Sequence, residues 1–241
     1  MRKMEWAARA EHLGGVPRKL VFLAVGALAK AVVNLFNTTT VYNVETLLRL
    51  VRSRPSGVPL LTVSNHMSTM DDPLMWGFKD FPITDPKLGR WVLAAEDICF
   101  KNSMLSYFFR VGKCIPITRG GGIYQEHMNE ALDHLRDGSW VMPEKYIFGR
   151  RPPFPLWNRE IRIVIGEPMM FDLHELKQRA VEMSKDLSFS SVGWPNTTPC
   201  GLDEAAQRCL YNIISERIRV AMEGLRNVAA SAGKTVLKPR N

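Results

Sequence analysis

The stretch from Val58 to Pro73 constrains the fold most, because it passes from an apolar segment through a polar loop to a helix start. Residues 58–63 are apolar or β-branched, which predicts a buried strand. Asp72 followed by Pro73 is typical of a helix N-cap with proline in the first turn. The polar loop is therefore expected at the carboxyl end of a strand, where open α/β sheets place their sites.

His66 and Asp71 lie in this loop, five residues apart. A histidine beside a carboxylate can act as a general base, with the carboxylate holding the imidazole tautomer. Neither Ser64 nor Ser68 lies in a nucleophile-elbow motif, so such a base would act on a hydroxyl of the substrate. Metal binding is disfavoured, because no third ligand is suitably spaced. Taken alone, an isolated pair of this kind favours a loop histidine that is merely hydrogen-bonded to Asp71.

Alternating strand and helix patterns predict one α/β domain over residues 1–241, with a mixed, largely parallel sheet flanked by helices. We expect strands at 58–63, 91–95, 113–117 and 160–166, a strand stub at 139–142, and a strand followed by a helix within 41–51. We expect helices at 73–77, 98–111, 123–136 and 172–185, and a C-terminal amphipathic helix at 203–230.

The charge indicates an anionic partner. The formal net charge is +8 and the pI about 9.5, which suits nucleic acid, anionic lipid or an anionic substrate. No basic tract interleaved with aromatic residues and no nucleic-acid-binding motif is present, so lipid is favoured. The four cysteines form neither a CxxC pair nor a zinc spacing, and we expect reduced thiols, with pairing of Cys200 and Cys209 left open.

Residues 20–36 form an apolar segment that Lys30 interrupts. A helix that spans a bilayer needs about 20 predominantly apolar residues, and this segment is shorter and charged at its middle. Two interpretations remain from the residues alone. It is either an amphipathic helix of the core or a helix that lies in the membrane interface with its lysines at the headgroups.

A second candidate site follows the strand expected at 113–117. Arg119, Gly120 and Gly121 lie between this strand and the next helix. Backbone N–H groups at a helix N-terminus attract anions, and a guanidinium clamps phosphate, so the segment suits an anion. The alternative is a flexible connection with a solvated arginine.

The junction at 139–160 lacks the pattern of its surroundings. Four prolines lie between residues 143 and 155, and no helical periodicity is present. Parallel strands normally need a crossover of a dozen or more residues, usually helical. The pattern therefore predicts missing material or an excursion at the sheet edge.

The segment Asn65–Asp71 fits the NHxSxxD form of the HX4D motif of glycerolipid acyltransferases, and Gly112–Arg119 resembles the second block of that family. The resemblance extends to the tafazzin branch, which remodels cardiolipin, and covers about residues 17–182. It rests further on Ala95–Asn102, Gly122–Gln125 and Ile163–Pro168.

This resemblance implies an O-acyltransferase of glycerophospholipids that needs no cofactor. His66 would deprotonate the free hydroxyl of a lysophospholipid, Asp71 would orient His66, and Arg119 would hold the lipid phosphate. The remaining substrate-binding residues would be Asn65, Ser68, Gly120 and Gly121. The acyl group would come from another phospholipid rather than from acyl-CoA. Attachment would be monotopic, on mitochondrial membranes facing the intermembrane space.

One departure from the family concerns its third block, Phe-Pro-Glu-Gly, which is expected soon after Trp140. The chain instead continues Val141-Met-Pro-Glu-Lys145. The simplest account is an internal deletion at about 140/141 that removes roughly one α/β unit. Such a chain is either an active transacylase or a catalytically impaired membrane-binding isoform, and it is expected to expose apolar sheet.

Overall fold

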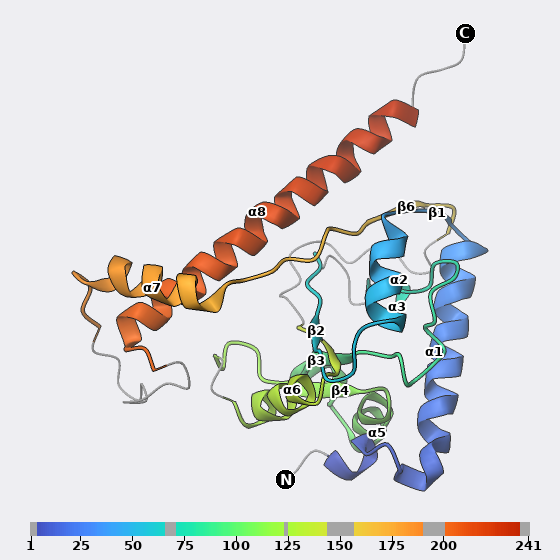
Figure 1. Cartoon of the computed structure of the whole chain (residues 1–241). Helices are drawn as coiled ribbons and strands as arrows, with labels where there is room; N and C mark the ends of the chain where they lie inside the picture. The colour runs from blue at the N-terminus through green and yellow to red at the C-terminus, as the bar shows by residue number, and fades with distance from the viewer. Residues whose placement is uncertain (1–3, 66–70, 123–124, 144–156, 190–200, 237–241) are drawn as a thin grey trace. The chain divides into compact units, whose positions relative to one another are not determined.

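The structure, a computed structural model, describes residues 4–65, 71–122, 125–143, 157–189 and 201–236 (Figure 1). The chain forms two compact units, residues 1–165 and 166–241. The helices of the first unit are the 3-10 helices η1 (Glu5–Ala8) and η2 (His12–Gly15), then α1 (Val16–Asn34), α2 (Val44–Arg52), α3 (Asp71–Leu74), α4 (Glu96–Cys99), α5 (Ser103–Val111) and α6 (Glu126–Arg136). Its strands are β1 (Thr38–Tyr42), β2 (Leu60–Leu61), β3 (Trp91–Ala95), β4 (Cys114–Ile117), β5 (Trp140–Met142) and β6 (Glu160–Val164).

Four strands form the main sheet, in the order β2-β5-β3-β4, and every pairing is parallel. Leu60 pairs with Trp140, and Val92 pairs with Cys114. The carboxyl ends of all four strands therefore lie at one edge of the sheet. This arrangement of parallel strands and flanking helices confirms the predicted α/β class.

β5 is buried on both faces. Trp140 and Met142 belong to an apolar cluster with residues of α1 and α2, whereas Val141 packs in a second cluster with Ala131 of α6. Because successive side chains of a strand point to opposite faces, the three residues of β5 contribute to both cores. The predicted stub is thus a short strand at an interior position of the sheet.

β1 and β6 form a separate two-stranded parallel sheet, with Thr38 paired to Glu160 and Tyr42 to Val164. The buried Asn37 holds the beginning of this pairing. Its Nδ2 donates to the carbonyl of Val32 at 2.6 Å, and its Oδ1 accepts from the backbone N–H of Arg159 at 2.9 Å.

The prediction of a buried strand at 58–63 is wrong in both the length and the burial of the strand. Only Leu60 and Leu61 form strand, and the side chains of Leu61 and Val63 are 55% and 38% exposed. The physical reason is position: within the described residues β2 pairs only with β5, which is three residues long, so β2 lies at the edge of the sheet.

The expected helix at 98–111 is divided in two, α4 and α5. The break falls at Asn102, whose side chain accepts from the backbone N–H of Leu105 at 2.9 Å and caps α5. The helix expected at 123–136 is confirmed from Glu126 to Arg136 as α6. Residues 123 and 124 lie outside the described part of the chain.

The second unit contains α7 (Leu173–Ser184) and α8 (Glu204–Val236), which pack together around Leu176, Ala180 and Leu210. The Asp172 carboxylate caps α7 by accepting from the backbone N–H groups of residues 174 and 175. The helix predicted at 172–185 is confirmed, and the helix predicted at 203–230 extends six residues further.

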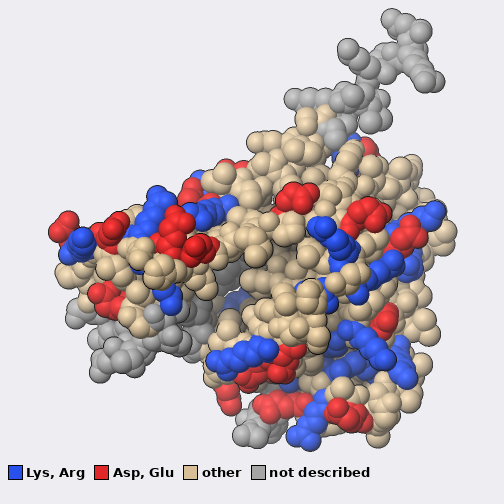
Figure 2. Space-filling model, viewed as in Figure 1, with Lys and Arg blue, Asp and Glu red and all other residues tan. Residues whose placement is uncertain are grey.

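Basic and acidic side chains alternate over the face of the molecule shown in Figure 2. On that face the basic side chains therefore do not form one continuous basic patch.

Candidate active site

The strand β2 leads into the first predicted motif. The exposed Asn65 follows its carboxyl end, and α3 begins at Asp71. His66 and Ser68 lie outside the described residues. The two ends of the motif loop are therefore placed by β2 on one side and by α3 on the other.

The expectation that Asp72 caps a helix is wrong. Asp72 has a non-helical backbone (φ −99°, ψ 112°) and joins Pro73 through a cis peptide bond. Its Oδ1 accepts from the indole N–H of Trp76 at 2.7 Å and forms an ion pair with Arg90. The helix ends at Leu74, and the carboxylate that was expected to cap it binds two side chains of the core instead.

Arg90 is a buried cation directly beside this motif. Its guanidinium carbon lies 4.7 Å from the ring centroid of Trp76 and 5.9 Å from that of Trp140. Burial lowers the pKa of Arg90 to about 9. Its Nε has no hydrogen-bond partner among the described residues. Sequence reasoning missed Arg90, because nothing in its local pattern indicates burial.

The predicted phosphate-binding turn follows β4. Gln125 closes this turn: its Oε1 accepts from the backbone N–H of Thr118 at 2.8 Å, and its Nε2 donates to the carbonyls of Thr118 and Gly122 at 3.0 and 2.6 Å. Gly120 and Gly122 have φ values of +77° and +71°, a region that favours glycine. The glycines and the Gln125 amide thus fix a loop for which the sequence alone left a flexible connection as the alternative.

Arg119 and Gly121 lie on the surface of this loop. The guanidinium of Arg119 pairs with the carboxylate of Asp97, which follows β3, and its Nε donates to Asp97 Oδ1 at 3.1 Å. The hydrogen bond from Arg119 holds the pKa of Asp97 below its usual range, although desolvation opposes this shift. Arg119 therefore stands at the carboxyl edge of the sheet with a carboxylate as its present partner.

Asn65, at the start of the first motif, and Arg119 follow the carboxyl ends of two different strands of the sheet. β2 and β4 are separated by β5 and β3, so at about 4.8 Å per strand their carboxyl ends are about 14 Å apart. A lipid bound by both motifs must span this distance, or the loops beyond the strand ends must shorten it.

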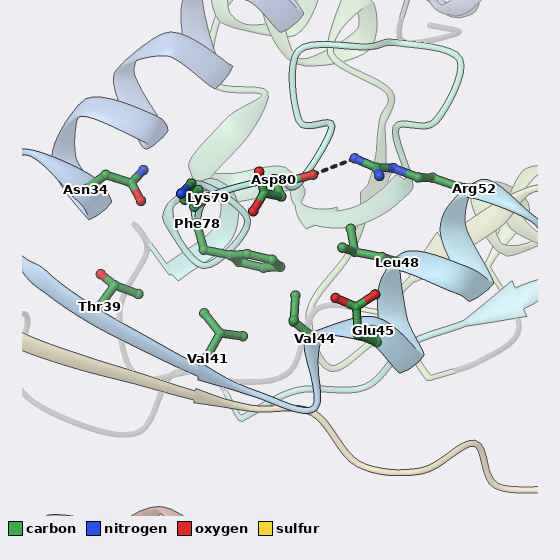
Figure 3. Close-up of a pocket in the computed structure, with 10 residues that line it drawn as sticks. All are labelled: Asn34, Thr39, Val41, Val44, Glu45, Leu48, Arg52, Phe78, Lys79 and Asp80. Atoms are coloured by element: carbon green, nitrogen blue, oxygen red, sulfur yellow. Dashed lines mark hydrogen bonds between the residues drawn. The ribbon is translucent and has the colours of Figure 1, made fainter.

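A pocket of about 450 Å³ lies elsewhere, between the end of α1, β1, α2 and the turn at 78–80 (Figure 3). The apolar lining residues of the pocket are Val41, Val44, Leu48 and Phe78. The polar and charged lining residues are Asn34, Thr39, Glu45, Arg52, Lys79 and Asp80. Arg52 donates to the carbonyl of Asp80 at 2.6 Å. None of the residues that the motifs predict lines this pocket, and no sequence signal indicated it.

Within the described part of the chain, no group of three or more His, Cys, Asp or Glu side chains is arranged to hold a metal ion. No disulfide joins two cysteines within the described residues, and Cys200 lies outside this part of the chain.

Comparison with known proteins identifies the family. The acyltransferase family matches residues 39–147. An N-acylphosphatidylethanolamine synthase of Arabidopsis thaliana is 49% identical over 277 aligned positions, which cover 94% of this chain and 98% of the relative. The tafazzin of Drosophila melanogaster is 44% identical over 127 residues, 52% of this chain and 34% of that protein. The protein of Dictyostelium discoideum named taffazin is 42% identical over 130 residues, 52% of this chain and 45% of that protein.

The first of these relatives matches along nearly its whole length and nearly the whole of this chain. The tafazzins match over about half of the chain and less than half of their own length. The prediction of an acyltransferase is therefore confirmed at the level of the family, and the chain belongs to the acyltransferase family.

Proposed function

We propose that this protein transfers a fatty acyl group from a phospholipid to the free hydroxyl of a lysophospholipid, as a transacylase of the tafazzin type. The observation that carries the proposal is that Asn65, the first residue of the Asn65–Asp71 motif, and Arg119 follow the carboxyl ends of β2 and β4, two parallel strands of one sheet. Substrates of open α/β sheets bind at that edge. The matches to tafazzins over half the chain support the same chemistry.

In the proposed reaction His66 accepts the proton of the acceptor hydroxyl as the oxygen attacks the ester carbonyl of the donor lipid. Asp71 orients the imidazole and stabilises its charged form. Collapse of the tetrahedral intermediate breaks the bond to the donor oxygen, which takes the proton from His66. One ester is formed and one is cleaved, so the step needs neither cofactor nor acyl-CoA. The guanidinium of Arg119 releases the carboxylate of Asp97 and binds the phosphate group of a lipid.

A second candidate function is N-acylation of phosphatidylethanolamine. It is favoured by the Arabidopsis relative, which is named for the synthesis of N-acylphosphatidylethanolamine and matches over almost the whole chain. A general base can deprotonate an ammonium group as well as a hydroxyl, so the proposed catalytic pair suits both acceptors.

One assay separates these candidates. Full-length protein is mixed with vesicles that contain acyl-labelled phosphatidylglycerol as donor and either lysophosphatidylcholine or phosphatidylethanolamine as acceptor, and labelled acyl-CoA replaces the lipid donor in a third arm. Label in new phosphatidylcholine supports transacylation, and label in an amide supports N-acylation. We expect His66→Ala to lower the rate by about 10²–10⁴-fold. Equal rates for the wild type and His66→Ala would reject the mechanism.

We further propose that α1 docks on the membrane surface. One face of the helix packs in the core through Ala29, Val32 and Val33. The opposite face exposes apolar side chains at helical spacing, and the large ones are Val16, Leu20, Leu23 and Leu28. Leu35 and Phe36, which follow α1, also have exposed side chains. No described helix is long and apolar enough to cross a bilayer.

Sedimentation with vesicles tests this docking. Leu20→Asp and Leu23→Asp add charge to the exposed face of α1 and are expected to lower the bound fraction at least tenfold. Leu132→Asp, at an exposed position on α6, serves as the matched control. Equal loss in all three variants would contradict docking through α1.

The proposed location, on mitochondrial membranes facing the intermembrane space, is tested by protease protection in isolated mitochondria.

We also propose that the chain lacks an α/β unit near residue 140. The alignment with the Arabidopsis relative spans 277 positions, more than the 241 residues of this chain, which supports the presence of additional residues in the relative. The exposed side chain of Leu61 in β2 supports the expected exposure of apolar sheet. If no labelled product forms with any donor or acceptor, the alternative of a catalytically impaired membrane-binding isoform is favoured.

A further inference from the structure

We propose that Arg90 is a positioning residue of the acyl-transfer site, acting through Asp72 on the neighbouring Asp71. The proposal rests on the proposed function, because it assigns Asp71 a catalytic role. It concerns a side chain that no sequence motif indicated.

The Arg90 side chain is held in one place by the core. It is 7% exposed and lies over the indole rings of Trp76 and Trp140. These two indoles contact each other edge to face, with ring centroids 5.0 Å apart. Burial at this level excludes contact with a lipid substrate. Any effect of Arg90 on catalysis must therefore pass through the side chains that it touches.

Asp72 is the side chain that transmits this effect. It accepts the ion pair from Arg90 and the hydrogen bond from the Trp76 indole on the same oxygen, Oδ1. A carboxylate bound by two core groups cannot rotate without breaking both contacts. The backbone of Asp72 is non-helical at this point, so the two contacts, rather than a regular helix, determine the direction of the chain at Asp71.

The ion pair also has a clear energetic asymmetry. Removal of one partner from a buried pair leaves an uncompensated charge, which destabilises the structure, whereas removal of both partners is often much less harmful. The Nε of Arg90 is already without a hydrogen bond within the described residues. The core thus contains a buried cation, Arg90, whose main described polar partner is the carboxylate of Asp72, the residue after Asp71.

The chain offers a matched control in the ion pair of Arg110 and Glu130. Arg110 is 1% exposed, donates to both oxygens of Glu130 at 3.2 and 2.8 Å, and likewise has an Nε without a partner among the described residues. It also donates to the carbonyl of Cys114, at the amino end of β4. Arg110 belongs to α5 and Glu130 to α6, outside the segment 71–76 that contains Asp72, so the loss of this pair serves as the test of stability.

The test compares Arg90→Gln, Arg90→Lys, Asp72→Asn and the double variant Arg90→Gln/Asp72→Asn with Arg110→Gln. Initial rates of acyl transfer to lysophosphatidylcholine in vesicles are divided by the folded fraction. We expect Arg90→Gln to lower kcat at least tenfold with KM within threefold of the wild type. Arg90→Lys, which keeps the charge, restores part of this loss, and the double variant loses less than the product of the single losses. Arg110→Gln changes kcat less than threefold.

Hydrogen exchange of the backbone amides at 64–76 provides a second measurement that needs no activity. Exchange there is expected to rise at least fivefold in Arg90→Gln and Asp72→Asn and to stay unchanged in Arg110→Gln. The proposal is overturned if Arg110→Gln matches Arg90→Gln in both measurements, or if KM changes in place of kcat. If the wild type transfers no acyl group, the proposed function fails while hydrogen exchange still decides the positioning role. Asp72→Asn, which keeps the size and the acceptor oxygen, decides it if Arg90→Gln does not fold.

Discussion

Replacement of Lys113 by methionine should change how the stability of the protein depends on pH. Lys113 is a buried cation just before β4. Its Nζ donates to the carbonyl of Gly89 at 2.8 Å and lies 5.7 Å from the ring centroid of Trp91. Burial lowers the pKa of this ammonium group to about 8, with a further lowering by Arg18 and an opposing effect of Asp85. The ordinary value is 10.5.

The direction in which stability changes with pH follows from proton binding. Below about pH 8 both the folded and the unfolded chain carry the proton of Lys113. Between about pH 8 and 10.5 the unfolded chain retains this proton and the folded chain loses it, so the free energy of unfolding rises with pH. At about 1.4 kcal/mol per pKa unit, the full rise from this group is about 3 kcal/mol. Lys113→Met abolishes this contribution and also removes the hydrogen bond to Gly89.

The assay is urea unfolding of the wild type and Lys113→Met at several pH values from 7 to 10.5. The other titrating groups contribute equally to both proteins, so the difference between their unfolding free energies isolates Lys113. We expect the wild type to gain about 3 kcal/mol relative to the variant across this range. A difference that stays constant, or that moves in favour of the variant as the pH rises, would refute the reasoning.

Three further substitutions test separate parts of the structure. Leu176→Ala should lower the unfolding free energy by about 2–5 kcal/mol, because Leu176 is fully buried between α7 and α8; a change below about 1 kcal/mol in urea unfolding would contradict this packing. Asn37→Ala should accelerate hydrogen exchange in β1, since it removes both side-chain hydrogen bonds that hold the β1–β6 pairing, and unchanged exchange would show that the pairing does not need them. Gln125→Ala should raise KM for a phosphate-bearing acceptor severalfold by releasing the turn that presents Arg119, whereas an unchanged KM would remove that turn from substrate binding.

The sequence predicted those elements whose pattern is local. The strand 91–95 is observed as β3 with the same bounds, and the helix expected at 172–185 is observed as α7, with Asp172 as its cap. Each of these segments has both an apolar pattern and a boundary residue within a few positions. The turn at 118–122, which we propose binds phosphate, was equally visible, because a strand, an arginine and three glycines follow one another in the sequence.

Pairings between distant segments could not be predicted. Nothing in residues 140–142 indicates that they lie between β2 and β3, and this placement makes β2 an edge strand. Asp72 has the local appearance of a helix cap, but it binds Arg90, eighteen residues later in the chain. The local preference for capping is worth only about 1 kcal/mol, and in the folded chain the carboxylate is instead engaged by the Arg90 guanidinium and the Trp76 indole. Arg90 therefore remained outside the predicted site.

The order of the strands in the main sheet also determines when that sheet can be completed during synthesis. β3 and β4 are neighbours in sequence and can pair as soon as the ribosome has released them. β2, which leads into Asn65, finds its described partner only when residues 140–142 emerge. Non-local parallel pairing is slow and leaves strands exposed while it waits. The nascent chain therefore holds the histidine motif on an unpaired strand until β5 arrives, and a chaperone that shields β2 during translation should raise the yield of folded protein.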